Sequence, residues 1–107
     1  MKRYRVEFSL EAQEDVERSF EWGRSEWGEE AALRWYRKLQ TYTRKILTVI
    51  PLAQSIAPEG REVGREIRQL IFGRYRILFE VDGNLVKVLH IKGAFVTKNV
   101  KDLGVDE

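Results

Sequence analysis

Residues 64–94 read GREIRQLIFGRYRILFEVDGNLVKVLHIKGA, and this stretch decides the fold. Apolar and charged residues alternate with a period of two along three runs, residues 66–72, 74–81 and 84–92. That period is typical of strands with one buried face. Asp82-Gly83 separates the second run from the third and is a strong hairpin signal. The stretch therefore predicts a three-stranded meander.

Side-chain alternation around the hairpin assigns each residue to one of two faces. The first face is almost wholly apolar and has to pack against helices; it holds Tyr75, Ile77, Phe79, Val81, Val86, Val88 and His90. The second face mixes aliphatic with charged side chains; it holds Arg74, Arg76, Leu78, Glu80, Leu85, Lys87, Leu89 and Ile91.

The second face predicts a binding surface. It carries an apolar patch with a basic rim, formed by Leu78, Leu85, Leu89 and Ile91 with Arg74, Arg76 and Lys87. Such an exposed patch is a candidate partner site. The alternative is that the loop after the helices, the C-terminal tail or a neighbouring molecule covers it. Coverage by the chain's own segments would leave no room for a guest peptide.

Upstream of the meander, the sequence predicts one strand and two helices. Residues 4–8 alternate apolar with charged, as a short strand does. Ser9 stands at an N-cap position before a helix over residues 10–27, and Gly28 is placed to end it. A second helix begins at Glu29 and has to stop at Pro51; its apolar stripe is Ala32 or Leu33, Tyr36, Leu39, Thr43, Ile46 and Ile50.

Residues 51–64 contain two prolines and two glycines and predict a loop, long for so small a domain. Residues 97–107 form a polar tail that we expect to fray. The chain is thus expected to form a single α+β domain over residues 1–107. Its order is β-α-α-β-β-β, with a helical hairpin packed on one face of a small, mostly antiparallel sheet.

Composition excludes several classes of protein. The 107 residues leave room for one domain, and the absence of cysteine removes disulfides, thiolate zinc sites and a cysteine nucleophile. No signal peptide or membrane span is apparent, so we expect a cytoplasmic protein without a membrane partner. Residues 1–60 hold ten Lys/Arg and ten Asp/Glu, whereas residues 61–101 hold nine and four. This basic half indicates an anionic partner, nucleic acid or an acidic protein segment, unless the charges only solvate strand faces.

Few residues indicate chemistry. His90 is the only histidine, and alternation places it on the core face, which favours a partly buried structural role. Trp27 and Trp35 are expected in the core or between helices, and Trp22 is expected to be exposed. The paired carboxylates Glu11/Asp15 and Glu14/Glu17 suit the solvated first turns of a helix. No phosphate loop, metal cluster or catalytic triad is present, so we expect neither a cofactor nor a metal.

These motifs in this order resemble the RelE/ParE toxin superfamily, and more closely its ParE-like, plasmid-stabilisation branch. The matching features are Arg68-Gln69-Leu70, Gly73-Arg74-Tyr75-Arg76, an acidic-Gly turn, Val88-Leu89-His90 running to Gly93, and the strand start YRVEFS. The resemblance spans roughly residues 4–95. Each motif is short, and the specificity comes from their order and spacing.

The resemblance implies a toxin of a type II toxin–antitoxin pair. Family members are neutralised by a cognate antitoxin whose disordered C-terminal region folds on the toxin. The free toxin arrests growth by cutting messenger RNA on the ribosome, as RelE-like members do, or by poisoning DNA gyrase, as ParE-like members do.

Metal-free RNA cleavage needs a proton acceptor, a proton donor and cations for the charged phosphorane. Arg76 matches the strand arginine of RelE-like members. However, Ile67 and Gln69 stand where those members bear lysines, and Ala94-Phe95-Val96 follow Gly93 where a ribonuclease has Arg, Tyr or His. These departures favour a ParE-like toxin that is not an enzyme. Lys92 replaces a histidine common in close relatives, which is a departure from the general family pattern at this site.

Two sets of site residues follow from the resemblance. Target or antitoxin binding is assigned to Arg68, Arg74, Arg76, Leu78, Lys87, Leu89, Ile91 and Lys92, although the turn at Gly73 does not fix which way Arg68 faces. If the chain is instead a ribosome-dependent endoribonuclease, its catalytic residues are Arg76, His90 and Lys92. A third alternative is an inactivated toxin that persists as an interaction module.

Overall fold

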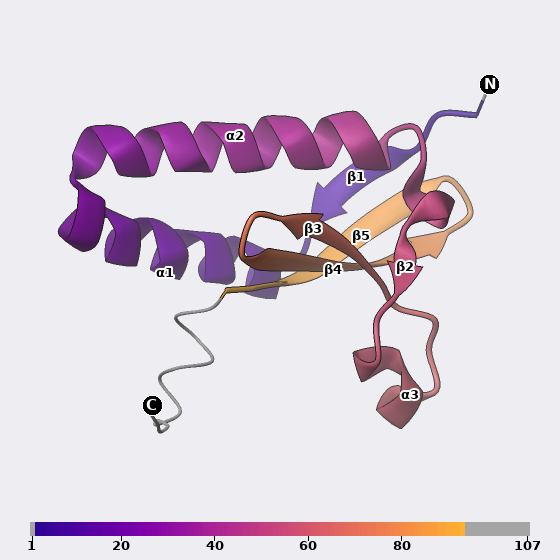
Figure 1. Ribbon diagram of the computed structural model, residues 1–107. Coiled ribbons are helices and arrows are strands. Elements are labelled where there is room, and N and C mark those ends of the chain that lie inside the picture. The colour runs from indigo at the N-terminus through magenta and orange to yellow at the C-terminus, as the bar shows by residue number, and fades with distance from the viewer. Residues whose placement is uncertain (1, 94–107) are drawn as a thin grey trace.

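The computed structural model describes residues 2–93, in which a helical hairpin packs on a five-stranded sheet (Figure 1). The elements are β1 (Arg5–Phe8), α1 (Leu10–Trp27), α2 (Glu29–Leu47), the 3-10 turn η1 (Pro51–Ala53), β2 (Ser55–Ile56), α3 (Glu59–Val63), β3 (Arg68–Phe72), β4 (Tyr75–Asp82) and β5 (Leu85–Lys92). The strand order is β1-β5-β4-β3-β2. Only β1 pairs in parallel, with β5. The predicted α+β class and the helical hairpin are confirmed.

The two long helices begin where the sequence indicates, and α1 also ends there. The hydroxyl of Ser9 accepts a hydrogen bond from the amide of Ala12, which caps α1. Gly28 has φ of 96°, a value that favours glycine, and joins α1 directly to α2. α2 ends at Leu47, three residues earlier than the proline rule predicts, and η1 takes up Pro51.

The main core lies between the helices and one face of the sheet. Ile77, Phe79, Val86 and Val88 have no exposed surface and pack with residues of both long helices, namely Ala12, Val16, Leu39 and Leu47. Full burial of such side chains stabilises the fold by about 1.5–3 kcal/mol each. Tyr36 and Ile50, expected in the buried stripe, are instead 39% and 47% exposed. Ile50 lies beyond the end of α2, so the helical period does not extend to it.

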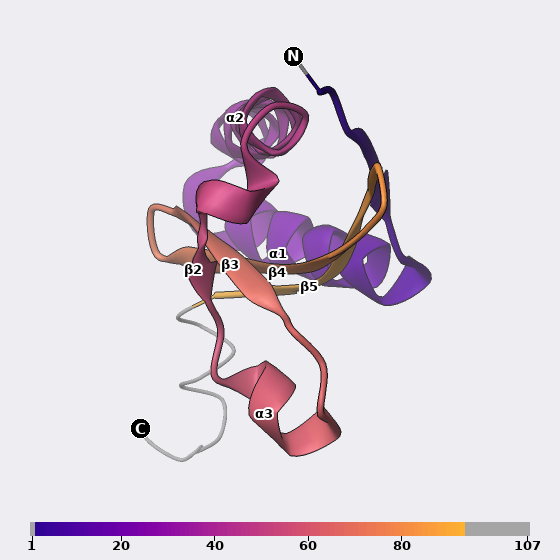
Figure 2. The same ribbon diagram turned by 90° about the vertical axis from the view of Figure 1, so that its right-hand side faces the viewer.

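Residues 51–67 are more ordered than the predicted loop. β2 adds an edge strand through the pairs Ser55 with Gln69 and Ile56 with Arg68. α3 then lies on the side of β3 and β4 opposite to α2 (Figures 1 and 2). A two-residue strand and a five-residue helix are too short to show a period, which is why the sequence does not reveal them.

A β-bulge in β5 changes the predicted faces. Phe79 pairs with Val88, but Leu78 pairs with His90, so Leu89 has no partner across the ladder. The extra residue reverses the alternation beyond it. Ile91 lies opposite Ile77 in the main core and is 3% exposed. The predictions that His90 lies on the core face and Ile91 on the open face are therefore wrong.

Helix α1 supplies the hydrogen bonds that the bulge leaves unmade in the sheet. Ser9 Oγ donates to the carbonyl oxygen of Leu89 at 3.1 Å. The carboxylate of Asp15 accepts from the amide of Ile91 at 2.9 Å. Both backbone groups are thus satisfied although the ladder is interrupted. The interpretation of Asp15 as a solvated helix residue is wrong, since its side chain is only 13% exposed.

The tryptophans divide differently from expectation. Trp35 is half-buried against Tyr75, with ring centroids 5.1 Å apart, as predicted. Trp27 is 44% exposed and packs edge-to-face on Trp22 at the end of the hairpin, so its predicted burial is wrong. Trp22 is exposed as expected. Among the helices of residues 2–93, none is long and apolar enough to cross a membrane.

Candidate functional site

The predicted open face of the sheet is partly covered by the chain itself. Ala57 and Ile67, on either side of α3, pack on Leu78 and form a second small core with Leu89 at its margin. Leu78 is consequently only 3% exposed. The prediction of a wide open leucine patch is wrong for Leu78, whereas Leu89 stays partly exposed.

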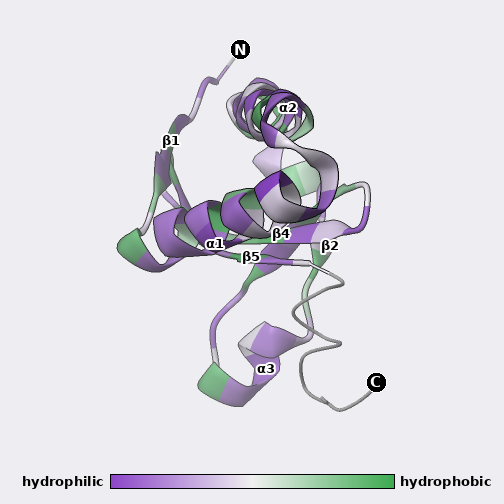
Figure 3. Cartoon of the chain, turned by 90° about the vertical axis from the view of Figure 1, so that its left-hand side faces the viewer, coloured by the Kyte–Doolittle hydropathy of each residue, from purple (hydrophilic) through white to green (hydrophobic). Residues whose placement is uncertain are grey.

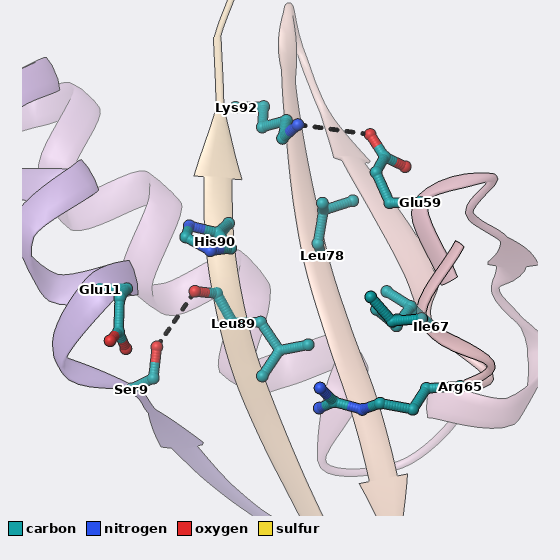
Figure 4. Close-up of a pocket in the computed structure, with 10 residues that line it drawn as sticks. Ser9, Glu11, Glu59, Arg65, Ile67, Leu78, Leu89, His90 and Lys92 are labelled. Atoms are coloured by element: carbon teal, nitrogen blue, oxygen red, sulfur yellow. Dashed lines mark hydrogen bonds and ion pairs between the residues drawn. The ribbon is translucent and has the colours of Figure 1, made fainter. Parts of the chain in front are cut away.

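A groove remains between this cover and the start of α1 (Figure 4). Its volume is about 410 Å³, and its floor is apolar while titratable groups stand around it. The lining residues are Ser9, Glu11, Glu59, Val63, Arg65, Ile67, Leu78, Leu89, His90 and Lys92. Four segments far apart in sequence therefore meet at one concave site.

Arg76 is held at the end of the groove by two side chains. Its guanidinium donates to both carboxylate oxygens of Glu59 at 2.8 and 2.9 Å, and to the amide oxygen of Gln69 at 2.8 and 2.9 Å. Lys92 Nζ lies 3.5 Å from the same carboxylate (Figure 4). Bidentate pairs of this kind are strong and geometrically specific.

The charge of Glu59 is stabilised by these partners. The hydrogen bonds from Arg76 lower the pKa of Glu59 from 4.5 to about 2, while partial burial opposes the change and Lys92 adds a smaller favourable effect. The carboxylate therefore stays ionised throughout the physiological pH range. It neutralises Arg76, one of the five cations that the sequence assigns to partner binding.

His90 lines the same groove and is half exposed. Its Nδ1 lies 3.1 Å from Asp15, the carboxylate that also holds the bulge amide. Arg65, another lining cation, pairs with Glu80 at 2.6 Å. Among the described residues, the four cationic or titratable groups Arg65, Arg76, His90 and Lys92 thus each contact a carboxylate of the chain.

The structure separates the rest of the predicted binding set. Arg68 lies opposite Phe79 on the helix-facing side, where it donates to the carbonyl of Gln54 at 2.7 Å. Arg74 is exposed in the turn before β4, and Lys87 is exposed on β5. Of the predicted set, Leu78, Leu89 and Lys92 line the groove, while Arg76 reaches its rim through Glu59.

Sequence reasoning missed Ser9, Asp15, Glu59 and Arg65 as parts of this site. The N-cap motif was the only signal for Ser9, and it did not indicate the second hydrogen bond to β5. Glu59 and Arg65 belong to the segment predicted as a loop. Ala94, Phe95 and Val96, which bear on the ribonuclease alternative, and the tail 97–107 lie outside the described residues.

The architecture defines a class of small α+β proteins, in which a helical hairpin covers one face of a mixed sheet. Several solved structures share it, among them two from toxin–antitoxin systems. One, of the chromosomal ParDE system of P. aeruginosa, matches with a TM-score of 0.70 and 16% identity over 85% of this chain and 96% of that chain. The other, the RelBE2 toxin–antitoxin complex of Mycobacterium tuberculosis, matches with a TM-score of 0.62 and 19% identity over 87% and 93%. At these identities the likeness shows the fold alone.

Residues 6–94 match the family described as the ParE toxin of type II toxin–antitoxin system, parDE. No curated protein sequence matches the chain significantly. Because the family match spans most of the sequence, the chain belongs to the ParE toxin family. The resemblance inferred from residues 64–94 is confirmed.

Proposed function

We propose that this chain arrests growth by binding a protein target, DNA gyrase, and that a cognate antitoxin neutralises it. Membership of the ParE toxin family supports the toxin role. The observation that carries the choice of target class is the state of Arg76 and Lys92. Both of these cations, which RNA cleavage would require, contact the carboxylate of Glu59.

The chemistry of RNA cleavage explains why that pairing matters. A phosphorane carries extra negative charge, and a site that stabilises it needs cations that are free to contact its oxygens. Here the carboxylate of Glu59 occupies the bidentate face of Arg76. A phosphate approaching Arg76 or Lys92 meets that negative charge first. This arrangement favours a toxin that acts by binding over one that acts as an enzyme.

The groove supports an antitoxin site narrower than the one the sequence predicts. Its floor of Leu78, Leu89 and Ile67 suits an apolar anchor, and the half-exposed ring of His90 gives it a polar margin. Peptide segments that fold on binding use such mixed surfaces. The two similar solved structures are described as a toxin–antitoxin system and a toxin–antitoxin complex.

Gyrase assays test the target. Purified full-length chain is expected to block supercoiling of relaxed plasmid and to accumulate cleaved DNA in the presence of gyrase. His90→Ala, a change at a half-exposed side chain, is expected to keep this effect because no catalysis is involved. Unaltered supercoiling and DNA breakage at saturating protein would remove the gyrase proposal.

A ribosome-dependent endoribonuclease is the second candidate, and one contact favours it. Asp15 holds Nδ1 of His90 while the ring lines the groove, an arrangement that can orient an imidazole as a general base. This candidate predicts cuts in messenger RNA on stalled ribosomes that disappear in His90→Ala and Arg76→Ala. Expression without growth arrest would instead indicate an inactivated toxin that serves as an interaction module.

A further inference from the structure

The outer face of α2 carries a basic stripe separate from the groove. Residues 31–58 contain five basic residues and no acidic one. At 100° per residue, four of these cations and one threonine fall within about 100° of arc. They are Arg34, Arg37, Lys38, Thr41 and Lys45, all exposed and opposite the buried positions of the helix. We call this set the α2 stripe.

The cations of the α2 stripe are unpaired. Among residues 2–93, none of the four takes part in an ion pair, whereas Arg18 and Arg24 of α1 pair with Asp15 and Glu21. The fifth cation, Arg44, is occupied, since it donates to the carbonyl of Val6 and lies over the ring of Phe8. The exposed face of α1 carries both signs of charge along its length. On α2, the acidic residue Glu30 lies on the same arc in the first turn, and no acidic residue follows it in the helix.

We propose that the α2 stripe is a docking surface for the phosphate backbone of a nucleic acid. From Arg34 to Lys45 the stripe extends about 16 Å at 1.5 Å per residue. One strand of a duplex presents a phosphate about every 3.4 Å along the axis, so four cations face about five phosphates. Figure 3 views α2 nearly along its axis and shows hydrophilic residues among its turns.

The composition of the stripe favours nucleic acid over an acidic protein segment. Protein interfaces have an apolar core and are depleted in lysine, whereas nucleic-acid interfaces are polar and strongly positive. No member of the stripe is apolar. The nearest apolar groups, the contacting rings of Tyr42 and Phe72, are half-buried in a depression of about 450 Å³ at its side, where they can accept a sugar. This inference does not depend on the target of the toxin.

Titration of a labelled 20-base-pair duplex DNA with the full chain tests the proposal. Four phosphate contacts predict a slope of about −3.6 in log K against log salt, and affinity should fall on the order of 100-fold between 50 and 200 mM salt. The variant Lys38→Gln with Lys45→Gln should reduce the magnitude of the slope by about 1.8. The matched control Arg18→Gln with Arg24→Gln removes the same net charge from α1 and should leave the slope nearly unchanged.

Three outcomes would overturn the proposal. One is the absence of DNA binding at 50 mM salt by protein whose circular dichroism shows it folded. Another is an equal loss of binding in the α2 and α1 variants, since the effect would then be one of net charge. In the third, polyglutamate displaces the labelled duplex as well as unlabelled DNA does at the same concentration of negative charge. The stripe would then be a site for acidic polypeptide. DNA binding that weakens only in the α2 variant would support it.

Discussion

The sheet groove and the α2 stripe both carry cations, and they differ in what those cations contact. Around the groove, Arg65, Arg76 and Lys92 are each paired with a carboxylate of the chain. On the α2 stripe, no such partner is present among the described residues. Charge that is paired internally positions segments, because leaving it unpaired and half-buried is costly. Charge that is unpaired and exposed stabilises little and remains available to a partner. Substitutions at the groove should therefore change stability, and those on the stripe should change binding alone.

The largest effect is expected in residues 57–67, the segment that covers Leu78 beside the groove. A Cβ added at Gly60 would lie 2.1 Å from the carbonyl oxygen of Arg65, so Gly60→Ala has to displace α3 and uncover Leu78. We expect a loss of about 2–3 kcal/mol in the free energy of unfolding, measured in urea. Gly64→Ala is the matched control, since no atom lies within 4 Å of its added Cβ and only its φ of 66° is unfavourable. It should cost about 1 kcal/mol. Equal losses would mean that α3 does not hold the cover in place.

The contact between α1 and the bulge should have the next largest effect. Asp15→Ala leaves the amide of Ile91 without its acceptor and should cost about 2 kcal/mol. Asp15→Asn keeps an acceptor oxygen and should cost less. Glu14→Ala, an exposed carboxylate on the same helix, should change stability by less than about 0.5 kcal/mol. A neutral Asp15→Ala in urea denaturation would contradict the assignment of Asp15 to the bulge.

Glu59 should make stability depend on pH in acid. Its pKa is about 2 in the folded chain against 4.5 as an ordinary value, so the ionised form is favoured by folding. That stabilisation is complete above about pH 4.5 and is lost as pH falls toward 2. The full shift corresponds to about 3 kcal/mol, which we reduce to about 1–2 for a side chain that keeps contact with water. Glu59→Gln should remove this part of the acid dependence in denaturation at pH 2–7. If the stability of the wild type and of Glu59→Gln changed with pH in parallel, the acid dependence would not come from Glu59.

The α2 stripe should show the smallest effect on stability. Lys38→Gln with Lys45→Gln should change the free energy of unfolding by less than about 0.5 kcal/mol, because neither lysine forms an ion pair with any residue in the range 2–93. Thermal denaturation of the same preparations used for DNA titration measures this directly. A loss comparable with that of Glu59→Gln would show that these lysines have a structural role. The groove and the stripe would then not differ in their effect on stability.

Much of the fold could be predicted from local patterns. The Asp82-Gly83 turn, the period of two around it, the Ser9 cap and the Gly28 break each act over a few residues, so the sequence shows them directly. The candidate site was predicted less well. A single unpaired residue, Leu89, moved His90 out of the core and Ile91 into it. No local pattern indicates a bulge whose hydrogen bonds come from a helix 70 or more residues earlier.

The distribution of charge could likewise not be predicted from sequence alone. Counted by halves, the sequence places its basic surface after residue 60, and residues 1–60 are neutral. In the fold, much of the charge in the second half is paired, and the neutral first half separates into an acidic α1 and a basic α2. Sums over a segment cannot show which side chains meet.

The amino-acid sequence by itself determined the strands of the meander, the helical hairpin and the family, because periodicity, capping and turn chemistry are short-range properties of the chain. Only the tertiary structure decided which strand face is covered, where the bulge lies and which cations are neutralised. Those outcomes depend on contacts such as Asp15 with Ile91 and Glu59 with Arg76, whose partners are distant in sequence and become neighbours only when the sheet closes.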